Sequence, residues 1–183
     1  EGKVQLKSGL EEVTGEVSEF FKQRLRGIFG DYGFSYDVVD AVLAAGYDDF
    51  SDALSRAKAL AGFRKEPAFA DLMTAFVRAN NLSKNITSGD VNPGLATDES
   101  EKTLYSRILQ AEQESRAALE RRDYRSLLFS VAALQEPLDR FFNSVMVMVE
   151  DRDVRENRLA LLYRVAVMVK KVADLSKLVV EAK

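Results

Sequence analysis

The hydrophobic positions of this chain repeat at helical spacing along most of its length. From Leu134 onward, apolar side chains recur at i, i+4, i+7, i+11 and i+14, with a second apolar row beside the first. The two rows are Leu134, Leu138, Phe141, Val145 and Met148, and Phe142, Met146 and Val149. The pattern predicts one long helix through Val149, although Val145 to Val149 taken alone could form a short strand.

A second long helix is predicted after the charged turn Glu150-Asp151-Arg152-Asp153. Apolar residues from Leu159 to Ala173 repeat the helical period, and Asp153 followed by Glu156 is a plausible capping pair at the helix start. We therefore expect two long helices, folded back on each other around the charged turn, to organise the fold.

Shorter helices are predicted in the rest of the chain, where Gly, Pro and Asp residues separate the apolar stripes. These stripes cover residues 13–28, 36–43, 50–61, 69–77, 104–119 and 124–134. Ser35 and Gly46 are suited to begin and end the second helix, and Asp98 with Glu101 is another capping pair. Pro137 must interrupt or restart a helix because it lacks a backbone donor.

The longest break in the pattern is residues 85–97, which are rich in Asn, Ser, Gly and Pro. We expect a mobile loop here that joins two helical halves, and we expect residues 1–12 to be helical or frayed. No segment alternates like a strand over a useful length. The sequence therefore predicts a single all-α domain over residues 1–183, a bundle of about seven helices.

Composition agrees with a globular domain that does not cross a membrane. The chain has 183 residues, 46% of them hydrophobic and 30% charged. No run approaches the roughly 18 apolar residues of a membrane span, and no secretory signal is visible, so we expect a cytoplasmic protein. The chain begins Glu1-Gly2-Lys3 without Met, which suggests a piece of a larger protein.

The residue inventory argues against an independent enzyme. The chain contains no Cys and no His, which excludes disulfides, thiolate nucleophiles, imidazole bases and the commonest zinc ligands. Carboxylate pairs remain possible as acid and base, but no catalytic constellation stands out among the 29 acidic residues. We therefore predict no catalytic residue and no metal site in this domain.

The net charge of −3 requires any RNA-binding surface to be confined to one face. The best candidates follow the fourth apolar stripe: Arg78, Asn80, Asn81 and Lys84. Cations and amides of this kind bind phosphates and the edges of unpaired bases. The alternative is an ordinary polar helix end, in which the cations offset the helix dipole and Asn81 forms the cap. Arg56, Lys58, Arg64 and Lys65 add local basicity or form a solvated face.

For Arg158 and two aromatic pairs, the sequence favours a structural role over RNA binding. Arg158 lies toward the buried side of its helix, which favours a structural ion pair, whereas Arg155 is undecided between structure and RNA binding. The pairs Phe20-Phe21 and Phe141-Phe142 could stack on bases. Each pair falls on an apolar face, so we expect core packing for both.

Several blocks of the sequence resemble successive motifs in the C-terminal region of bacterial glycyl-tRNA synthetase β subunits. The similarity covers about residues 14–180. Its blocks are Phe21-Lys22-Gln23-Arg24-Leu25, residues 36–44, 56–60 and 76–82, the segment from Leu138 to Asp151, the segment from Arg155 to Leu162, and residues 172–175.

The resemblance implies an all-helical, DALR-type anticodon-binding domain, similar to the one that ends arginyl-tRNA synthetases. The implied parent is a glycine-tRNA ligase whose α subunit activates glycine with ATP and Mg²⁺, while the β subunit recognises tRNA. This domain would hold the tRNA(Gly) anticodon arm without a cofactor of its own, with the α subunit and the rest of the β subunit as its other partners.

The residues expected to bind RNA on this basis are Arg78, Asn81, Lys84, Arg56 and Arg155. The alternative function is a helical protein-protein module for subunit assembly. Exposed apolar area on the last helix would support that alternative.

Overall fold

The computed structural model describes residues 9–179, and that range contains helices and irregular connections without any strand. The α-helices are α1 (Leu10–Asp31), α2 (Tyr36–Ala44), α3 (Phe50–Phe63), α4 (Ala68–Leu82), α5 (Glu99–Glu120), α6 (Tyr124–Ala132), α7 (Gln135–Ser144) and α8 (Arg152–Lys170). Two 3-10 helices are η1 (Pro93–Leu95) and η2 (Leu175–Lys177). The predicted all-α class is confirmed, with eight α-helices in the described part of the chain.

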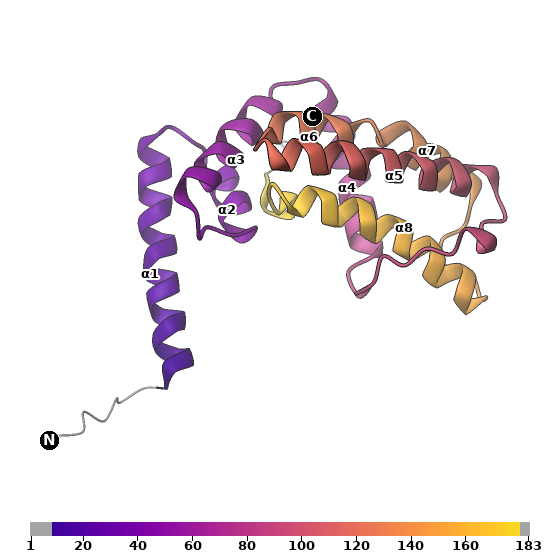
Figure 1. Ribbon diagram of the computed structural model, residues 1–183, viewed down its shortest axis with the longest axis horizontal. Coiled ribbons are helices and arrows are strands. Elements are labelled where there is room, and N and C mark those ends of the chain that lie inside the picture. The colour runs from indigo at the N-terminus through magenta and orange to yellow at the C-terminus, as the bar shows by residue number, and fades with distance from the viewer. Residues whose placement is uncertain (1–8, 180–183) are drawn as a thin grey trace, which may run out of the picture.

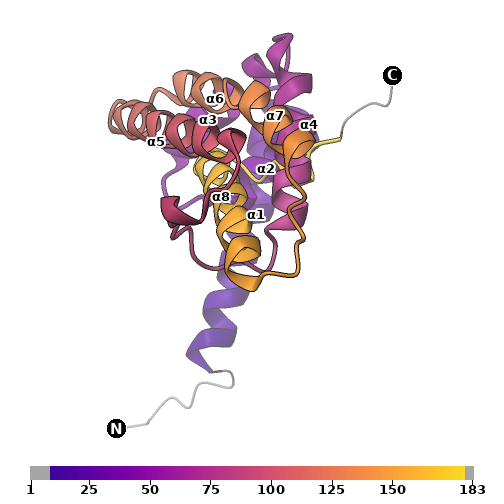
Figure 2. The same ribbon diagram turned by 90° about the vertical axis from the view of Figure 1, so that its right-hand side faces the viewer.

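Helices α4 to α8 form the body of the molecule, and α2 and α3 link this body to α1 (Figure 1). Within the body, α5 packs against α6, α7 and α8, while α4 contacts α6, α7 and α8 from another side. Both views show α1 extending away from the body (Figures 1 and 2).

Helix α8 is the centre of the hydrophobic core. Its buried apolar residues are Leu159, Ala160, Leu161, Leu162, Val165, Ala166, Met168 and Val169, and they surround most of the helix. A helix that is apolar on most of its circumference must be covered on several sides. Since burying one large aliphatic side chain contributes about 1.5–3 kcal/mol, the contacts of α8 with α4, α5 and α6 hold the two halves of the chain together.

Aspartates begin several of the helices. The predicted capping box is confirmed, because Asp98 accepts from the Ser100 amide and Glu101 accepts from the Asp98 amide. The predicted capping of α8 by Asp153 is wrong, because Asp151 is the N-cap and accepts from the amides of Asp153 and Val154. The cap lies two residues earlier because α8 begins within the charged turn.

The predicted continuation of a helix through Val149 is also wrong. Helix α7 ends at Ser144, and Val145 already has an extended backbone. Val147 is buried while Met146 and Met148 are 73% and 59% exposed, which is the alternation of an extended segment. Side chains of α8 hold this conformation, since Arg158 donates to the Met146 carbonyl at 2.9 Å and Arg155 donates to the Val149 carbonyl at 2.7 Å.

The expectation that Phe20 and Phe21 pack in the core is wrong as well. They are 60% and 57% exposed on α1, whereas Phe29 near the end of the same helix is fully buried. The apolar face of α1 therefore extends beyond the part that the body covers. Phe141 is buried as expected, and Phe142 is half-buried beside it.

The linker from residue 85 to 97 contains η1 and is tied to α8, since Asn157 Oδ1 accepts from the Asn92 amide at 2.7 Å. Its mobility stays a prediction. The fraying expected at the N-terminus concerns mainly residues 1–8, which lie outside the described range. No helix in the described range is long and apolar enough to span a membrane.

Candidate nucleic-acid interface

The C-terminal end of α4 presents the predicted basic and amide side chains on the surface. Leu72, Met73, Phe76 and Ala79 bury one face of α4. The opposite face then carries Arg78 and Asn81, both exposed, and the exposed Lys84 follows just after the helix. Ser83 closes the last turn by donating its amide and its hydroxyl to the Ala79 carbonyl. Ser83 rather than Asn81 is therefore the cap, and the Asn81 amide is not used for capping.

Arg78 is held by an aromatic ring rather than by a carboxylate. Its guanidinium carbon lies 3.9 Å from the centroid of the Phe142 ring, which comes from α7. A cation over an aromatic face at this distance is attracted by about 0.5–1 kcal/mol when exposed. Among the described residues no ion pair or hydrogen bond joins Arg78 to an acidic side chain, so its N–H donors remain available for a ligand.

The start of α8 lies next to the extended segment that follows α7. Arg155 is half-buried, and its Nη1 donates to the carbonyls of Val149 and Glu150. Arg152 is exposed and donates to Glu156 at 2.7 Å, and this hydrogen bond raises the pKa of Arg152. Arg155 therefore stabilises this end of the bundle, and its RNA-binding role stays a prediction.

Arg56 has a different environment from the other candidates. It is buried on α3 and does not belong to a solvated basic face. Its Nε bonds Asp52, and its terminal nitrogens donate to the carbonyls of Val42, Gly46 and Val172. These bonds join α3 to the end of α2 and to the segment after α8, so Arg56 has no role in the interface proposed below.

Arg158 forms the structural ion pair that the sequence predicts. Its Nε and Nη2 donate to the two carboxylate oxygens of Glu101 at 3.0 and 2.8 Å, and both residues are buried. Donation to Glu101 raises the pKa of Arg158 despite burial. This pair ties the start of α5 to α8 beneath the extended segment.

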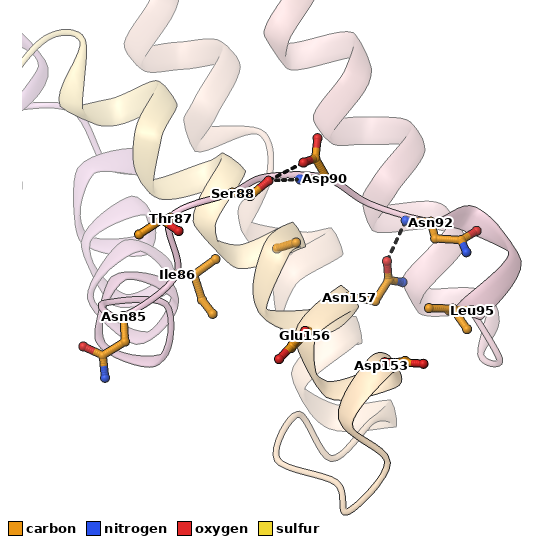
Figure 3. A pocket seen from close by; sticks show the side chains of 11 residues that line it. Asn85, Ile86, Thr87, Ser88, Asp90, Asn92, Leu95, Asp153, Glu156 and Asn157 are labelled. Carbon is orange, nitrogen blue, oxygen red and sulfur yellow. Dashed lines mark hydrogen bonds between the residues drawn. The ribbon is translucent and has the colours of Figure 1, made fainter.

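A cavity of about 620 Å³ lies between the linker and the first half of α8. Figure 3 shows Asn85, Ile86 and Thr87 at one side and Leu95 at the other, with Asp153 and Glu156 projecting from α8. Carboxylate oxygens repel phosphates but accept hydrogen bonds from the amino groups of bases. Asn85, which lines the cavity, directly follows Lys84 at the α4 end.

Asn157 lies in a segment that resembles the β subunits, but it is not among the residues expected to bind RNA. It is buried, it lines the cavity, and it fixes the linker through the Asn92 amide. Its Nδ2 has no hydrogen-bond partner among the described residues. A lone Asn inside a predicted helix gives no signal for this role, because the partner amide lies 65 residues away.

Comparisons with known proteins agree with this architecture. Residues 72–179 match the DALR anticodon binding domain family. The chain is 52% identical over 180 residues to the glycine-tRNA ligase beta subunit of Desulforamulus reducens, and 52% identical over 176 residues to that of Desulforudis audaxviator. It is 40% identical over 178 residues to the one from Syntrophus aciditrophicus.

These matches cover 96–98% of the chain and 25–26% of the relatives, so the chain spans about a quarter of their length. They confirm the resemblance to glycyl-tRNA synthetase β subunits. The matched part contains α5 to α8 and most of α4, which include the α4 end, the linker and the cavity. The chain belongs to the DALR anticodon-binding domain family.

Proposed function

We propose that this chain binds the anticodon arm of tRNA(Gly) as a domain of a glycine-tRNA ligase β subunit. In this proposal the α subunit carries out ATP- and Mg²⁺-dependent aminoacylation in the cytoplasm, and this domain contributes no catalytic residue and no cofactor. The relatives that carry similar sequence are glycine-tRNA ligase beta subunits, which supports this assignment.

The observation that carries the proposal is the geometry of Arg78 over Phe142. A guanidinium plane stacked on an aromatic ring is pre-organised, and its outer face can stack on an unpaired base while its edges bind phosphate. Stacking of one base on such a platform contributes about 1–3 kcal/mol. Because no described acidic side chain pairs with Arg78, this cation is available for RNA.

Neighbouring side chains add groups that can bind the RNA backbone and groups that can bind base edges. Lys84 supplies a second exposed cation for the RNA backbone, and Asn81 supplies an amide that both donates and accepts. In the cavity, Glu156 and Asp153 supply acceptors for base amino groups. The combination fits an unpaired loop better than a duplex, because only a loop presents the base edges.

Binding at this surface would assist catalysis through positioning. Energy gained at the anticodon arm holds the tRNA in one orientation, so the acceptor end spends more time at a remote active site. A domain with this task needs no reacting group. The lack of His and Cys is compatible with it.

The test is a double substitution, Arg78→Ala with Lys84→Ala, measured by fluorescence anisotropy against a glycine anticodon stem-loop. Loss of one stacked base and one or two phosphate contacts should weaken binding at least about tenfold, which is about 1.4 kcal/mol. The salt dependence should fall by about 0.7 in the log-log slope per lost contact. Arg78→Lys should recover the charge but not the stacking.

The matched control is Lys102→Ala with Arg107→Ala on α5. These residues are also exposed, and their removal changes the net charge by the same amount. The control should bind like the wild type. Equal weakening in both double variants would assign the effect to overall charge and would contradict a site at the α4 end.

A further inference from the structure

The exposed apolar side of α1 is a surface feature that RNA binding does not explain. We call it the α1 face and define it as Val13, Val17, Phe20, Phe21 and Ile28, which are all exposed. Their spacing of i, i+4, i+7, i+8 and i+15 places them in one stripe along the helix. Apolar side chains gathered in one stripe indicate a surface that another structure covers.

The α1 face continues beyond the part of α1 that the body covers, where Leu25 beside the stripe is half-buried against the core. Attachment comes from buried Phe29, from the Arg26 ion pair with Asp40 at 2.7 Å, and from the Ser18 and Tyr47 hydroxyls. Nine residues separate Phe20 from Phe29, which is about 180° around the helix at about 100° per residue. Every described side chain from Glu12 to Phe21 is exposed, and this half of α1 stands clear of the other helices (Figures 1 and 2).

A free-standing helix of this kind has little stability of its own. The exposed half of α1, residues 12–21, is shorter than the roughly 12–15 residues below which isolated helices are marginal in water, and most helical stability in proteins comes from packing an amphipathic face. Covering a Phe side chain that is more than half exposed recovers part of the roughly 1.5–3 kcal/mol for full burial. The α1 face therefore has the composition and the energetic reason to be covered.

The relatives narrow down which structure could cover the α1 face. The DALR match begins at residue 72, after α1, α2 and α3. The β-subunit matches reach 96–98% of the chain, which leaves too few residues unmatched to omit α1. About three quarters of each relative lies outside the matched region. Helix α1 is thus shared with β subunits without belonging to the matched anticodon-binding unit.

We infer that the α1 face packs against the remainder of the β-subunit polypeptide and docks the anticodon-binding domain on it. A second copy of this chain is a poorer occupant, because a stable dimer interface takes about 20–30 residues per side and the α1 face has five. A contact within one polypeptide needs less area, because the connecting chain holds both surfaces at millimolar effective concentration. This inference depends on membership in the β-subunit family and is independent of tRNA binding.

The test is hydrogen exchange of α1 amides in this chain alone and in a full-length β subunit that contains it. Amides in the exposed half of α1 should exchange at least about tenfold more slowly in the full-length subunit. Phe20→Ser with Phe21→Ser should abolish that protection in the full-length subunit. In the isolated chain the same variant should melt like the wild type, because both rings are already exposed. Leu109→Ser, an exposed apolar position on α5, is the control and should keep the protection.

Two results would overturn the inference. Equal exchange of α1 in both proteins, or protection that survives the double substitution, would show that the α1 face does not contact the rest of the subunit. Sedimentation of the isolated chain as a dimer, with α1 protected in that dimer and not in the full-length subunit, would assign the face to a second copy.

Discussion

Replacing Arg158 with Met should destabilise the fold strongly and in a pH-dependent manner. Arg158 donates two hydrogen bonds to the carboxylate of Glu101, which has no exposed surface, and a third to the Met146 carbonyl. Met has a similar length and preserves much of the packing, but it leaves a buried carboxylate without its cation. The extended segment after α7 also loses the donor that holds it.

The expected size follows from the burial of the pair. Removing one member of a buried, hydrogen-bonded ion pair costs about 3–5 kcal/mol, because the other charge remains desolvated. For a domain of this size, one kcal/mol corresponds to a change in Tm of about 2–4 °C. Arg158→Met should therefore lower the Tm by roughly 6–20 °C at pH 7.

The pKa of Glu101 determines how this effect depends on pH. Burial raises the pKa of Glu101, but the hydrogen bond from Arg158 and the other donors outweigh burial and hold the pKa below its usual value of 4.5. In the wild type, the stability that the Glu101–Arg158 pair contributes is therefore complete above about pH 4.5 and is lost as the pH falls through the lowered pKa of Glu101. Without Arg158, burial dominates and the pKa of Glu101 rises. Protonation then removes the unpaired charge, so the difference in Tm between Arg158→Met and the wild type should shrink toward pH 4.

Thermal melting of Arg158→Met at pH 7 and pH 4, followed by circular dichroism, checks both statements. Arg152→Met is the control, because Arg152 pairs with Glu156 at the exposed start of the same helix, where water and salt screen the pair, so this variant should melt nearly like the wild type. A Tm within about 2 °C of the wild type at pH 7, less than about 1 kcal/mol, would refute the reasoning. A deficit that is unchanged at pH 4 would refute the role of Glu101.

Further predictions concern other parts of the fold. Arg56→Lys should lower the free energy of unfolding by about 3 kcal/mol in urea titrations, since Lys cannot reach Asp52 and three carbonyls together. Gly46→Ala should cost about 1–3 kcal/mol in the same assay, because Gly46 has a φ of 126°. Burial and the hydrogen bond to Asp52 raise the pKa of Tyr124 from 10.0 to about 12. The stability that the Tyr124 hydroxyl contributes should therefore be complete below pH 10 and lost toward pH 12. Melts of Tyr124→Phe should not show this loss of stability at alkaline pH. Asn157→Ala should speed hydrogen exchange of the Asn92 amide without abolishing the fold.

Local patterns in the sequence predicted most of the helices, because their determinants lie within a few residues of each other. The Asp98 and Glu101 capping box needs only a spacing of three residues, and both hydrogen bonds form. Pro137 marks the first turn of α7 for a similar reason, since its missing N–H is not needed there. Arg158 was assigned to an ion pair from its position relative to the apolar face of its helix, and the structure supplies Glu101 as its partner.

The segment after α7 could not be predicted in this way. Its apolar residues fit both a helical period and an alternation, which periodicity alone does not distinguish in a short run. The choice is made by Arg155 and Arg158, which bind the segment's carbonyls from the next helix. The buried position of Arg56 could not be predicted for the same reason, because one of its acceptors is the Val172 carbonyl, 116 residues away.

The exposed phenylalanines of α1 show another limit of pattern analysis. The apolar stripe through Phe20 and Phe21 correctly predicts a helix with one apolar side. The pattern does not specify which structure covers that side. Exposed apolar area on the last helix would have supported a protein-protein module, but the core surrounds α8 from Asn157 to Val169. Exposed apolar area lies on α1 instead.

Anisotropy titration of the chain with a glycine anticodon stem-loop tests the central claim most directly. A second stem-loop with altered anticodon bases and two salt concentrations complete the experiment. The account predicts tighter binding to the glycine anticodon, with affinity falling with salt by a log-log slope of about −0.7 to −0.9 per phosphate contact. Equal affinity for both stem-loops, or binding that salt does not weaken, would contradict anticodon recognition by this domain.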